Sequence, residues 1–143
     1  MSQLQGRVMG IDYGLARIGV AVSDPLRITA RGVETVNWNG RDIEWAVNRI
    51  CELAEEYEVR EIVMGLPRRT DGKASPSEDG ARAFAAILEE RLSLKPIFRD
   101  ERYTTVLASR VLNEVDYKKQ NKRKVIDQVA AEIILQDYIN NSL

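Results

Sequence analysis

Residues 7–24 read RVMGIDYGLARIGVAVSD, and this stretch decides how the rest of the chain can fold. Its first half is a short apolar run that ends at Asp12, and its second half alternates apolar and small residues from Ile18 to Ser23. The pattern predicts a buried strand, a tight link through Gly14 and a second strand whose side chains alternate between two faces. A carboxylate at the exit of a buried strand is costly unless a metal ion, a basic partner or solvent offsets its charge. Asp12 is therefore the first candidate functional residue.

Length and composition limit the classes of protein to which the chain can belong. With 143 residues, 44% hydrophobic and 30% charged, it is expected to form one globular domain spanning residues 1–143. A net charge of −1 argues against coating of nucleic acid by bulk charge, although it permits a local basic patch. Cys51 is the single cysteine, and the sequence shows neither a signal peptide nor an apolar run of membrane-spanning length, so we expect a cytoplasmic protein. Histidine is absent, which excludes His-based triads and His-rich zinc sites and leaves carboxylates as the candidate catalytic groups.

The spacing of apolar residues predicts a meander of three strands followed by alternating helices and strands. We expect an α/β fold with a single mixed five-stranded sheet and helices on both faces, because crossover connections make the last strands parallel. The elements expected after the opening hairpin are a strand at 28–37, a helix at 41–57, a strand at 60–64, a polar loop at 68–79, a helix at 81–92, a strand at 95–100, a helix from Thr104 or Thr105 to 112, a basic loop at 118–124 and a final helix at 124–139.

Three acidic positions fall where such a sheet could bring them together: Asp12, Glu101 or its neighbour Asp100, and Asp127. Each has a structural alternative. Asp12 could cap a turn, the strand-end acids could be solvated, and Asp127, in the first turn of the final helix, could complement the helix dipole. Two consecutive alanines one turn after Asp127 would let that helix lie close on the sheet. Oxygen-only clusters suit Mg²⁺ or Mn²⁺, and two such ions can activate water for phosphodiester cleavage.

Basic residues form two groups, one in the polar loop after residue 67 and one just before Asp127. A run of charge is often only a solvated surface, but both groups flank the acidic positions in the predicted strand order. This placement favours a groove that tracks the phosphates of a nucleic acid. The candidate nucleic-acid-binding residues are Arg17, Arg68, Arg69, Lys73, Arg102, Lys118, Lys119, Lys122, Arg123 and Lys124. Arg17 and Arg102 could instead pair with Asp12 and Glu101.

Several blocks of the sequence, in the same order, resemble the YqgF/RuvX family. They are GIDYG at 10–14 followed by RIGVAVSD at 17–24, IVMGLP at 62–67 with Asp71-Gly72, DER at 100–102 with Thr104-Thr105, and residues 124–127 with Ala130-Ala131. The resemblance spans essentially the whole chain. It implies a ribonuclease H-like fold and a nuclease that matures the 5′ end of pre-16S ribosomal RNA; the family was earlier proposed to resolve Holliday junctions.

The resemblance also implies that Asp12, Glu101 and Asp127 are the metal-binding catalytic carboxylates. Glu101 is preferred to Asp100 because the strand exit could turn it toward Asp12. Asp24 could serve as a fourth carboxylate, outside this core set. In the mechanism we expect, Asp12 bridges two metal ions, Glu101 and Asp127 each hold one side, and residues 118–124 hold the nucleic-acid strand.

The leading hypothesis is a magnesium-dependent nuclease that acts on structured RNA, with ribosomal particles as a further candidate partner. A junction resolvase is the runner-up, and it would need two active sites in a symmetric dimer. The Gly-x-Asp-x-Gly turn at 10–14 also resembles the phosphate loop of actin-like and sugar-kinase ATPases, which bind nucleotide between two domains. A non-catalytic ribosome-assembly or nucleic-acid-binding module is the remaining alternative, and retained function after Asp12→Asn would indicate it.

Overall fold

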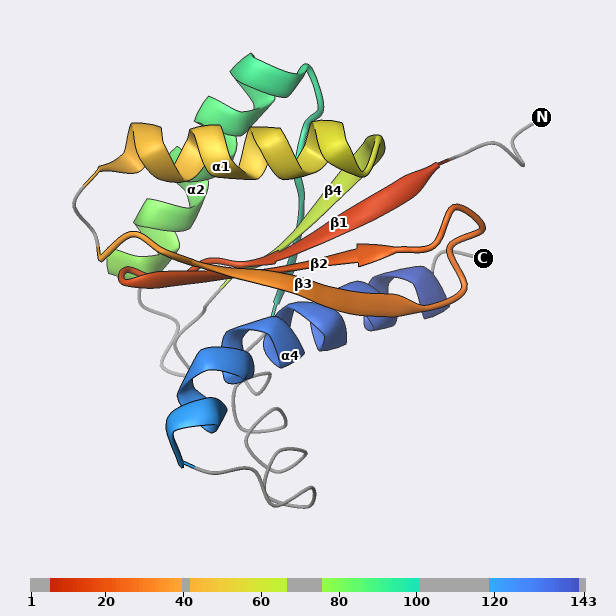
Figure 1. The fold of residues 1–143 in the computed structure, drawn as a ribbon. Coiled ribbons are helices and arrows are strands. Elements are labelled where there is room, and N and C mark those ends of the chain that lie inside the picture. Colours follow the sequence, from red (N-terminus) through yellow and green to blue (C-terminus); the bar gives the residue numbers. More distant parts are fainter. Residues whose placement is uncertain (1–5, 40–41, 67–75, 101–118, 142–143) are drawn as a thin grey trace.

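The computed structural model describes residues 6–39, 42–66, 76–100 and 119–141, and Figure 1 shows their arrangement. The strands are β1 (Arg7–Asp12), β2 (Arg17–Ser23), β3 (Ala30–Asn37), β4 (Val59–Leu66) and β5 (Ile97–Asp100), and the helices are α1 (Ile43–Glu56), α2 (Pro76–Leu92) and α4 (Lys119–Asn140). No helix in the described part of the chain is long and apolar enough to cross a lipid bilayer.

The five strands form one mixed sheet, in the order β3-β2-β1-β4-β5. Strand β2 is antiparallel to both β1 and β3, whereas β4 runs parallel to β1 and β5 runs parallel to β4. The predicted five-stranded mixed sheet is therefore confirmed. Because β1, β4 and β5 are parallel, their last residues Asp12, Leu66 and Asp100 lie at the same end of the sheet, which we call the carboxyl end.

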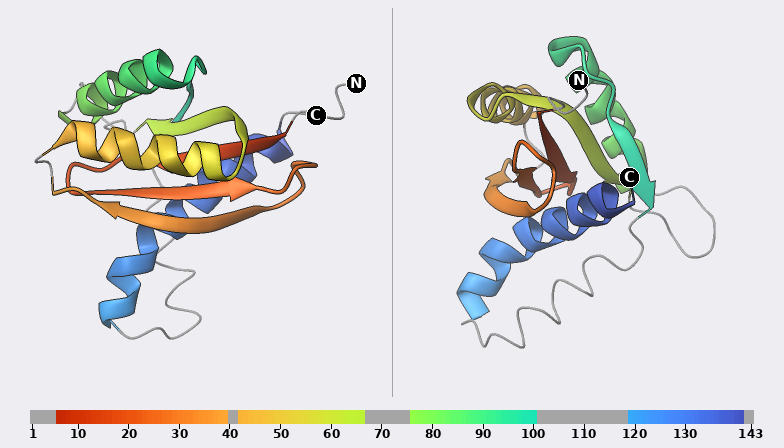
Figure 2. Two further views of the ribbon diagram at one scale, coloured as in Figure 1. Left: turned by 45° about the horizontal axis from the view of Figure 1, so that its top comes forward. Right: turned by 90° about the vertical axis from the view of Figure 1, so that its right-hand side faces the viewer.

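Helices cover both faces of the sheet, with α1 and α2 on one face and α4 on the other (Figures 1 and 2). The side chains of β1 enter these two layers alternately. Met9 and Ile11 join the core beneath α1 and α2, whereas Val8 belongs to a second core with Leu135 of α4. All four side chains are fully buried. The position of a residue in β1, odd or even, therefore decides which helical layer its side chain faces.

Helix α1 has a clear start signal and an amphipathic surface. The carboxylate of Asp42 caps it by accepting the backbone N–H groups of Glu44 and Trp45 at 3.0 and 3.3 Å. One stripe of the helix is buried against the sheet, and its residues are Ala46, Val47, Ile50, Leu53 and Ala54. The helix ends at Tyr57, and Glu58 takes a positive φ of 53° as the chain reverses into β4.

Helix α2 begins earlier than predicted. It starts at Pro76, inside the segment 68–79 that the sequence analysis assigned to a loop. Proline is favourable in the first helical turn because its missing N–H has no intrahelical partner to lose there, and two acids in that turn complement the helix dipole.

Helix α4 also begins earlier, at Lys119, so the predicted basic loop at 118–124 is wrong from Lys119 onward. Lysine, arginine and glutamine are good helix formers, and they extend the helix where the sequence analysis read only charge. Asp127 consequently lies more than two turns from the helix start, where the dipole effect has faded. The interpretation of Asp127 as a first-turn residue is therefore wrong. The predicted helix from Thr104 or Thr105 to 112 lies outside the described residues.

Candidate active site

Asp12 is the last residue of β1 and lies at the carboxyl end of the sheet. Its register partners are Gly19 on β2 and Gly65 on β4, so a glycine flanks it on each side. Val8 and Gly10 lie four and two residues before Asp12 on the strand, so these three positions face the same side of the sheet. Val8 packs with α4, and a Cβ placed on Gly10 would lie 2.7 Å from the Cβ of Leu135 in α4. The alternation along β1 therefore directs the half-buried Asp12 to the α4 face of the sheet.

Asp127 reaches the same place from α4. A Cβ built on Gly19 would lie only 1.9 Å from the backbone oxygen of Asp127 and 2.9 Å from its Cβ. Only a glycine at position 19 permits this approach. Since Gly19 is the register partner of Asp12, the contact brings Asp127 beside the strand that neighbours Asp12. Two of the three predicted carboxylates thus belong to adjoining elements on one face, although 115 residues separate them in the sequence (127 − 12).

Arg17 pairs with Asp127 across this site. Its Nε donates to the Asp127 carboxylate at 3.0 Å, and the side chains are 41% and 18% exposed, respectively. Burial raises the pKa of the Asp127 carboxyl above its ordinary value, and the charge and hydrogen bond of Arg17 oppose that rise. Asp127 is therefore a sheltered carboxylate whose charge a single, partly exposed arginine compensates only in part. Of the two roles that the sequence left open for Arg17, the structure shows pairing, and the partner is Asp127.

A row of polar side chains holds α4 in register on the edge strand β3. Glu132 accepts the backbone N–H of Gly32 at 2.6 Å, Gln136 accepts that of Ala30 at 3.0 Å, and Gln128 donates to the Thr35 hydroxyl at 3.2 Å. These three α4 residues are spaced four apart, so they lie on one side of the helix. Glu132 and Gln136 cover backbone donors at an open sheet edge. Together with Gln128, they fix the position of Asp127, the residue before Gln128.

The small residues predicted to bring α4 close to the sheet do so. Ala130 and Ala131 are buried, at 1% and 0% exposure, and a Cβ on Gly10 would lie 3.0 Å from the backbone oxygen of Ala131. The helix and β1 are thus in contact through small side chains on both surfaces.

An aromatic cluster that the sequence analysis missed holds the turn after Asp12. Tyr13 faces the other layer, where its ring centroid lies 6.0 Å from that of Trp38 and 5.5 Å from that of Phe84. Trp38 Nε1 donates to the backbone oxygen of Gly14 at 3.0 Å. A Cβ on Gly80 of α2 would lie 2.7 Å from the Tyr13 hydroxyl. The sequence signal was present in the three aromatic residues, but the sequence analysis did not connect them because they are far apart in the chain.

The third predicted carboxylate, Glu101, lies outside the described residues. The backbone of Asp100 ends β5 at the carboxyl end of the sheet, paired with Leu66. The preceding residue, Arg99, forms an ion pair with Asp137 of α4, so it faces the same layer as Asp12. Within the described ranges there is no group of three acidic or cysteine side chains that could hold a metal ion.

Asp24, raised as a fourth carboxylate, does not belong to this site. It follows β2 at the end of the sheet opposite Asp12, since Gly19 pairs with Asp12 and Val22 pairs with Met9. Its carboxylate accepts the backbone N–H groups of the turn that follows, at Leu26, Ile28 and Thr29. These bonds hold its pKa below the ordinary value.

The structure describes only some of the predicted basic residues. Arg17 is described above. Lys119, Lys122, Arg123 and Lys124 belong to the first turns of α4, which project away from the sheet before Asp127 (Figure 1), but their side chains lie outside the described set. The candidates wholly outside the described residues are Arg68, Arg69, Lys73, Arg102 and Lys118.

The architecture defines a fold class, the ribonuclease H-like fold of the RuvC type. The structure superposes on T. thermophilus RuvC, solved in complex with a Holliday junction substrate, with a TM-score of 0.62. The superposition covers 95% of this chain and 97% of that chain at 12% sequence identity. This likeness establishes the fold.

The sequence defines the family within that class. The profile of the RuvX family, described as a Holliday junction resolvase, matches residues 6–141, and the chain belongs to this family. A protein of Acetivibrio thermocellus is 43% identical over 136 residues, covering 94% of this chain and 96% of that protein. A protein of Moorella thermoacetica is 46% identical over 134 residues, covering 94% of each. Both carry the name "Putative pre-16S rRNA nuclease". The resemblance found in the sequence is confirmed.

Proposed function

We propose that this protein is a divalent-metal-dependent nuclease that hydrolyses a phosphodiester bond in processing the 5′ end of pre-16S ribosomal RNA. The observation that carries the proposal is the contact of Asp127 with Gly19, which places two carboxylates on one face at the carboxyl end of the sheet. The names of relatives at 43% and 46% identity supply the substrate.

The residues of the site suit a hard divalent cation. Asp12 and Asp127 offer only oxygen ligands, as Mg²⁺ and Mn²⁺ prefer. Asp127 is sheltered and carries a raised pKa despite its pairing with Arg17, so a second positive charge nearby would stabilise its ionised form. A bound divalent cation would supply Lewis-acid stabilisation of the charge that develops on the phosphate. The dependence of cleavage on Mg²⁺ concentration distinguishes one bound ion from two.

We assign Glu101 as the third ligand in preference to Asp100. Side chains alternate along a strand, and Glu101 is two residues beyond Arg99, whose guanidinium faces α4 through its ion pair with Asp137. Leu66, the register partner of Asp100, belongs instead to the core under α1 and α2. If the alternation of β5 continued one residue past its end at Asp100, Glu101 would share the face of Arg99, and we propose Glu101 on that ground.

The protein's own side chains position the substrate in this proposal. Arg17 lies at the site with a partly exposed guanidinium, so it can hold Asp127 and also meet a phosphate oxygen. The basic residues at the start of α4 would hold the nucleic-acid backbone beside the carboxylates, together with the basic candidates of the segments 68–73, 102 and 118.

The test is cleavage of a 5′-extended 16S precursor by the purified protein in Mg²⁺, compared with Asp12→Asn. The exposed residue Asp79 provides the matched control as Asp79→Asn. We expect cleavage by the wild type and the control but not by Asp12→Asn, and a titration of activity against Mg²⁺ reports how many ions are needed. Equal cleavage by all three proteins would refute the carboxylate site.

A second candidate function is resolution of four-way DNA junctions, and the description of the matching family favours it. The same proteins should be tested on a four-way junction in parallel. Symmetric cutting of the junction with no cleavage of the RNA precursor would replace the first proposal with this one, and it would be accompanied by a dimer in solution.

A further inference from the structure

A polar hollow lies at the end of the sheet opposite the candidate active site. It has a volume of about 190 Å³, and it opens beside the cap of α1 at Tyr57. Arg7 and Arg31 line it together with Val22, the register partner of Arg31. Arg7 is five residues before Asp12 along β1, which corresponds to roughly 17 Å of strand. This hollow is therefore separate from the acidic site.

The two arginines of the hollow differ from most of the arginine side chains that the structure describes. Among the arginine side chains that the structure describes, those in ion pairs are Arg17, Arg27, Arg49, Arg82, Arg91 and Arg99. Arg7 and Arg31 form no ion pair with any described residue. Thr29 and Tyr57 add hydroxyl groups to the same lining. The hollow thus presents two uncompensated guanidinium groups and neutral hydrogen-bond donors.

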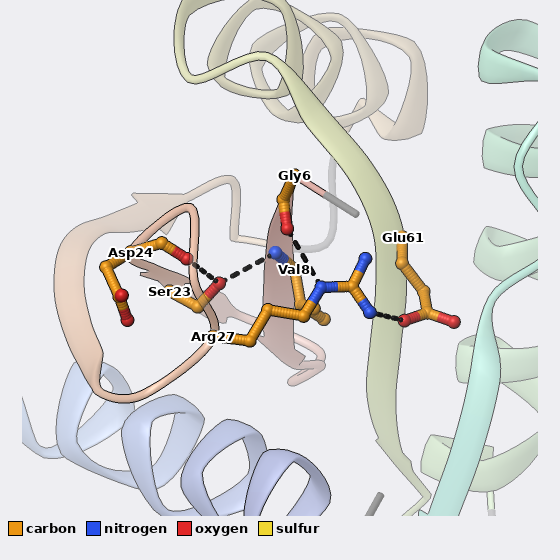
Figure 3. A network of polar contacts seen from close by, with 6 residues as sticks. All are labelled: Gly6, Val8, Ser23, Asp24, Arg27 and Glu61. Atoms are coloured by element: carbon orange, nitrogen blue, oxygen red, sulfur yellow. Dashed lines mark hydrogen bonds and ion pairs between the residues drawn. The ribbon is translucent and has the colours of Figure 1, made fainter. Parts of the chain in front are cut away.

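The polar contacts in Figure 3 connect the backbone of β1, the loop after β2 and β4 around these arginines. The Ser23 hydroxyl accepts the Val8 N–H at 2.9 Å and donates to the backbone oxygen of Asp24 at 2.9 Å. Arg27 does not line the hollow, and it donates to the backbone oxygen of Gly6 at 2.8 Å and to Glu61 at 2.7 Å. The loop after β2 is therefore already ordered around the hollow, and ligand binding need not order it.

The remaining acid in the lining does not neutralise both arginines. The Asp24 carboxylate is occupied by three backbone N–H groups of its own loop, so it is stabilised there without a guanidinium partner. Two positive charges against one negative charge leave the hollow positive. Its volume equals roughly six water molecules at about 30 Å³ each, which suits one oxyanion group rather than a whole drug-sized ligand.

We propose that this hollow binds a phosphate group, held between the guanidinium groups of Arg7 and Arg31. Arginine forms strong charge-assisted hydrogen bonds to phosphate, and two arginines on different strands can engage different oxygens. The phosphate belongs either to a nucleic-acid backbone beyond the cleaved bond or to a small free phosphate compound. Only the first of these sources rests on the proposed function.

The test uses the full chain, labelled with ¹⁵N and titrated with inorganic phosphate at constant ionic strength, with chloride as the reference anion. We expect saturable shifts of the Thr29, Arg31 and Tyr57 amide signals. Arg7→Gln and Arg31→Gln should each weaken phosphate binding about tenfold. Arg60→Gln, which removes an exposed arginine outside the hollow, should bind phosphate as the wild type does. Shifts equal to those in chloride, or unchanged affinity in both hollow variants, would overturn the proposal.

Thermal melting separates ligand binding from a structural role at the C-terminal end of α1. Phosphate should raise the melting temperature of the wild type and of Arg60→Gln but not that of Arg7→Gln/Arg31→Gln. A double variant that melts lower than the wild type by the same amount with and without phosphate would show a purely structural role and would overturn the proposal.

Binding of the RNA precursor across a range of salt concentrations identifies the source of the phosphate, and it needs no cleavage. A nucleic-acid source predicts that the double variant lowers the slope of log affinity against log salt by about 1. An unchanged slope, with inorganic phosphate still bound by the wild type, assigns the site to a small phosphate compound. Because both readouts are independent of catalysis, failure of this site is distinguishable from failure of the proposed nuclease activity.

Discussion

Replacement of Gly19 by alanine tests the contact on which the candidate active site depends. The new Cβ would lie 1.9 Å from the backbone oxygen of Asp127, whereas real Cβ atoms stay at least 3.0 Å away, so helix and strand must separate locally by about 1.1 Å. The obstructing atom belongs to the helix backbone and cannot rotate aside. Overpacking of this kind costs about 1–3 kcal/mol, and relief of the glycine entropy cost returns roughly 0.5–1 kcal/mol. We therefore expect a net loss of up to about 2.5 kcal/mol in the free energy of unfolding.

The effect of Gly19→Ala on activity should exceed its effect on stability. A displacement near 1 Å moves Asp127 relative to Asp12, and misplacement on that scale costs about 10²-fold in rate. Urea unfolding gives the stability, and kcat/KM for cleavage of the 5′-extended precursor gives the activity, both measured where the variant is fully folded.

Gly32→Ala is the matched control for Gly19→Ala. Gly32 also faces α4, but a Cβ there would meet the side chains of Gln128 and Glu132, at 2.9 and 3.0 Å, instead of the helix backbone. The Gln128 Cβ is fixed by the helix backbone, but it lies only about 0.1 Å inside the 3.0 Å limit, and the Glu132 carboxylate can rotate aside. This variant should therefore lose less than about 1 kcal/mol and keep its cleavage rate within about threefold. If Gly19→Ala matched Gly32→Ala in both stability and activity, the close approach of α4 would not be what assembles the site.

Three further variants test other parts of the structure. Burial raises the pKa of Asp127, so this carboxyl keeps its proton to higher pH in the folded chain than in the unfolded chain. Its contribution to stability therefore falls as the pH rises from the pKa of the unfolded chain to the higher pKa of the folded chain. Asp127→Asn should therefore abolish cleavage while leaving the free energy of unfolding at pH 7 equal to or above that of the wild type; a marked loss of stability would contradict this. Ser23→Ala leaves the buried N–H of Val8 without its acceptor and should cost about 1–3 kcal/mol in urea unfolding, while Thr29→Ala on the exposed loop serves as its control. Trp38→Phe keeps one aromatic ring but removes the indole N–H that donates to Gly14, together with part of the buried indole. We expect a loss of at least about 0.5–1.5 kcal/mol together with slower cleavage, and unchanged values in both assays would show that this bond does not hold the turn after Asp12.

The sequence was sufficient for features that depend on local periodicity. Alternation in residues 7–24 identified the hairpin, and helical spacing identified α1, because side-chain direction in a strand or helix follows directly from backbone geometry. Parallel crossovers then placed Asp12 and the end of β5 at the same end of the sheet. The starts of α2 and α4 were predicted too late in the sequence. Residues 76–79 and 119–124 are polar on all sides, so no apolar stripe marked them as helical.

Other features depend on residues that are distant in sequence, and only the tertiary structure decided them. Gly19 reads as an ordinary small residue of an alternating strand until α4 lies against it, and Arg17 could have paired with Asp12 as well as with Asp127. Likewise, Arg7 and Arg31 are two isolated charges in the sequence, and they meet only because β1, β2 and β3 align in one register. The periodicity of side chains depends on residues that are close in sequence, so it can be read from the sequence. Contacts between residues of different helices and strands arise only when these elements pack together. The sequence by itself therefore determined the layers and the candidate carboxylates of this protein, and the packing of α4 on the sheet decided which of the described groups face one another.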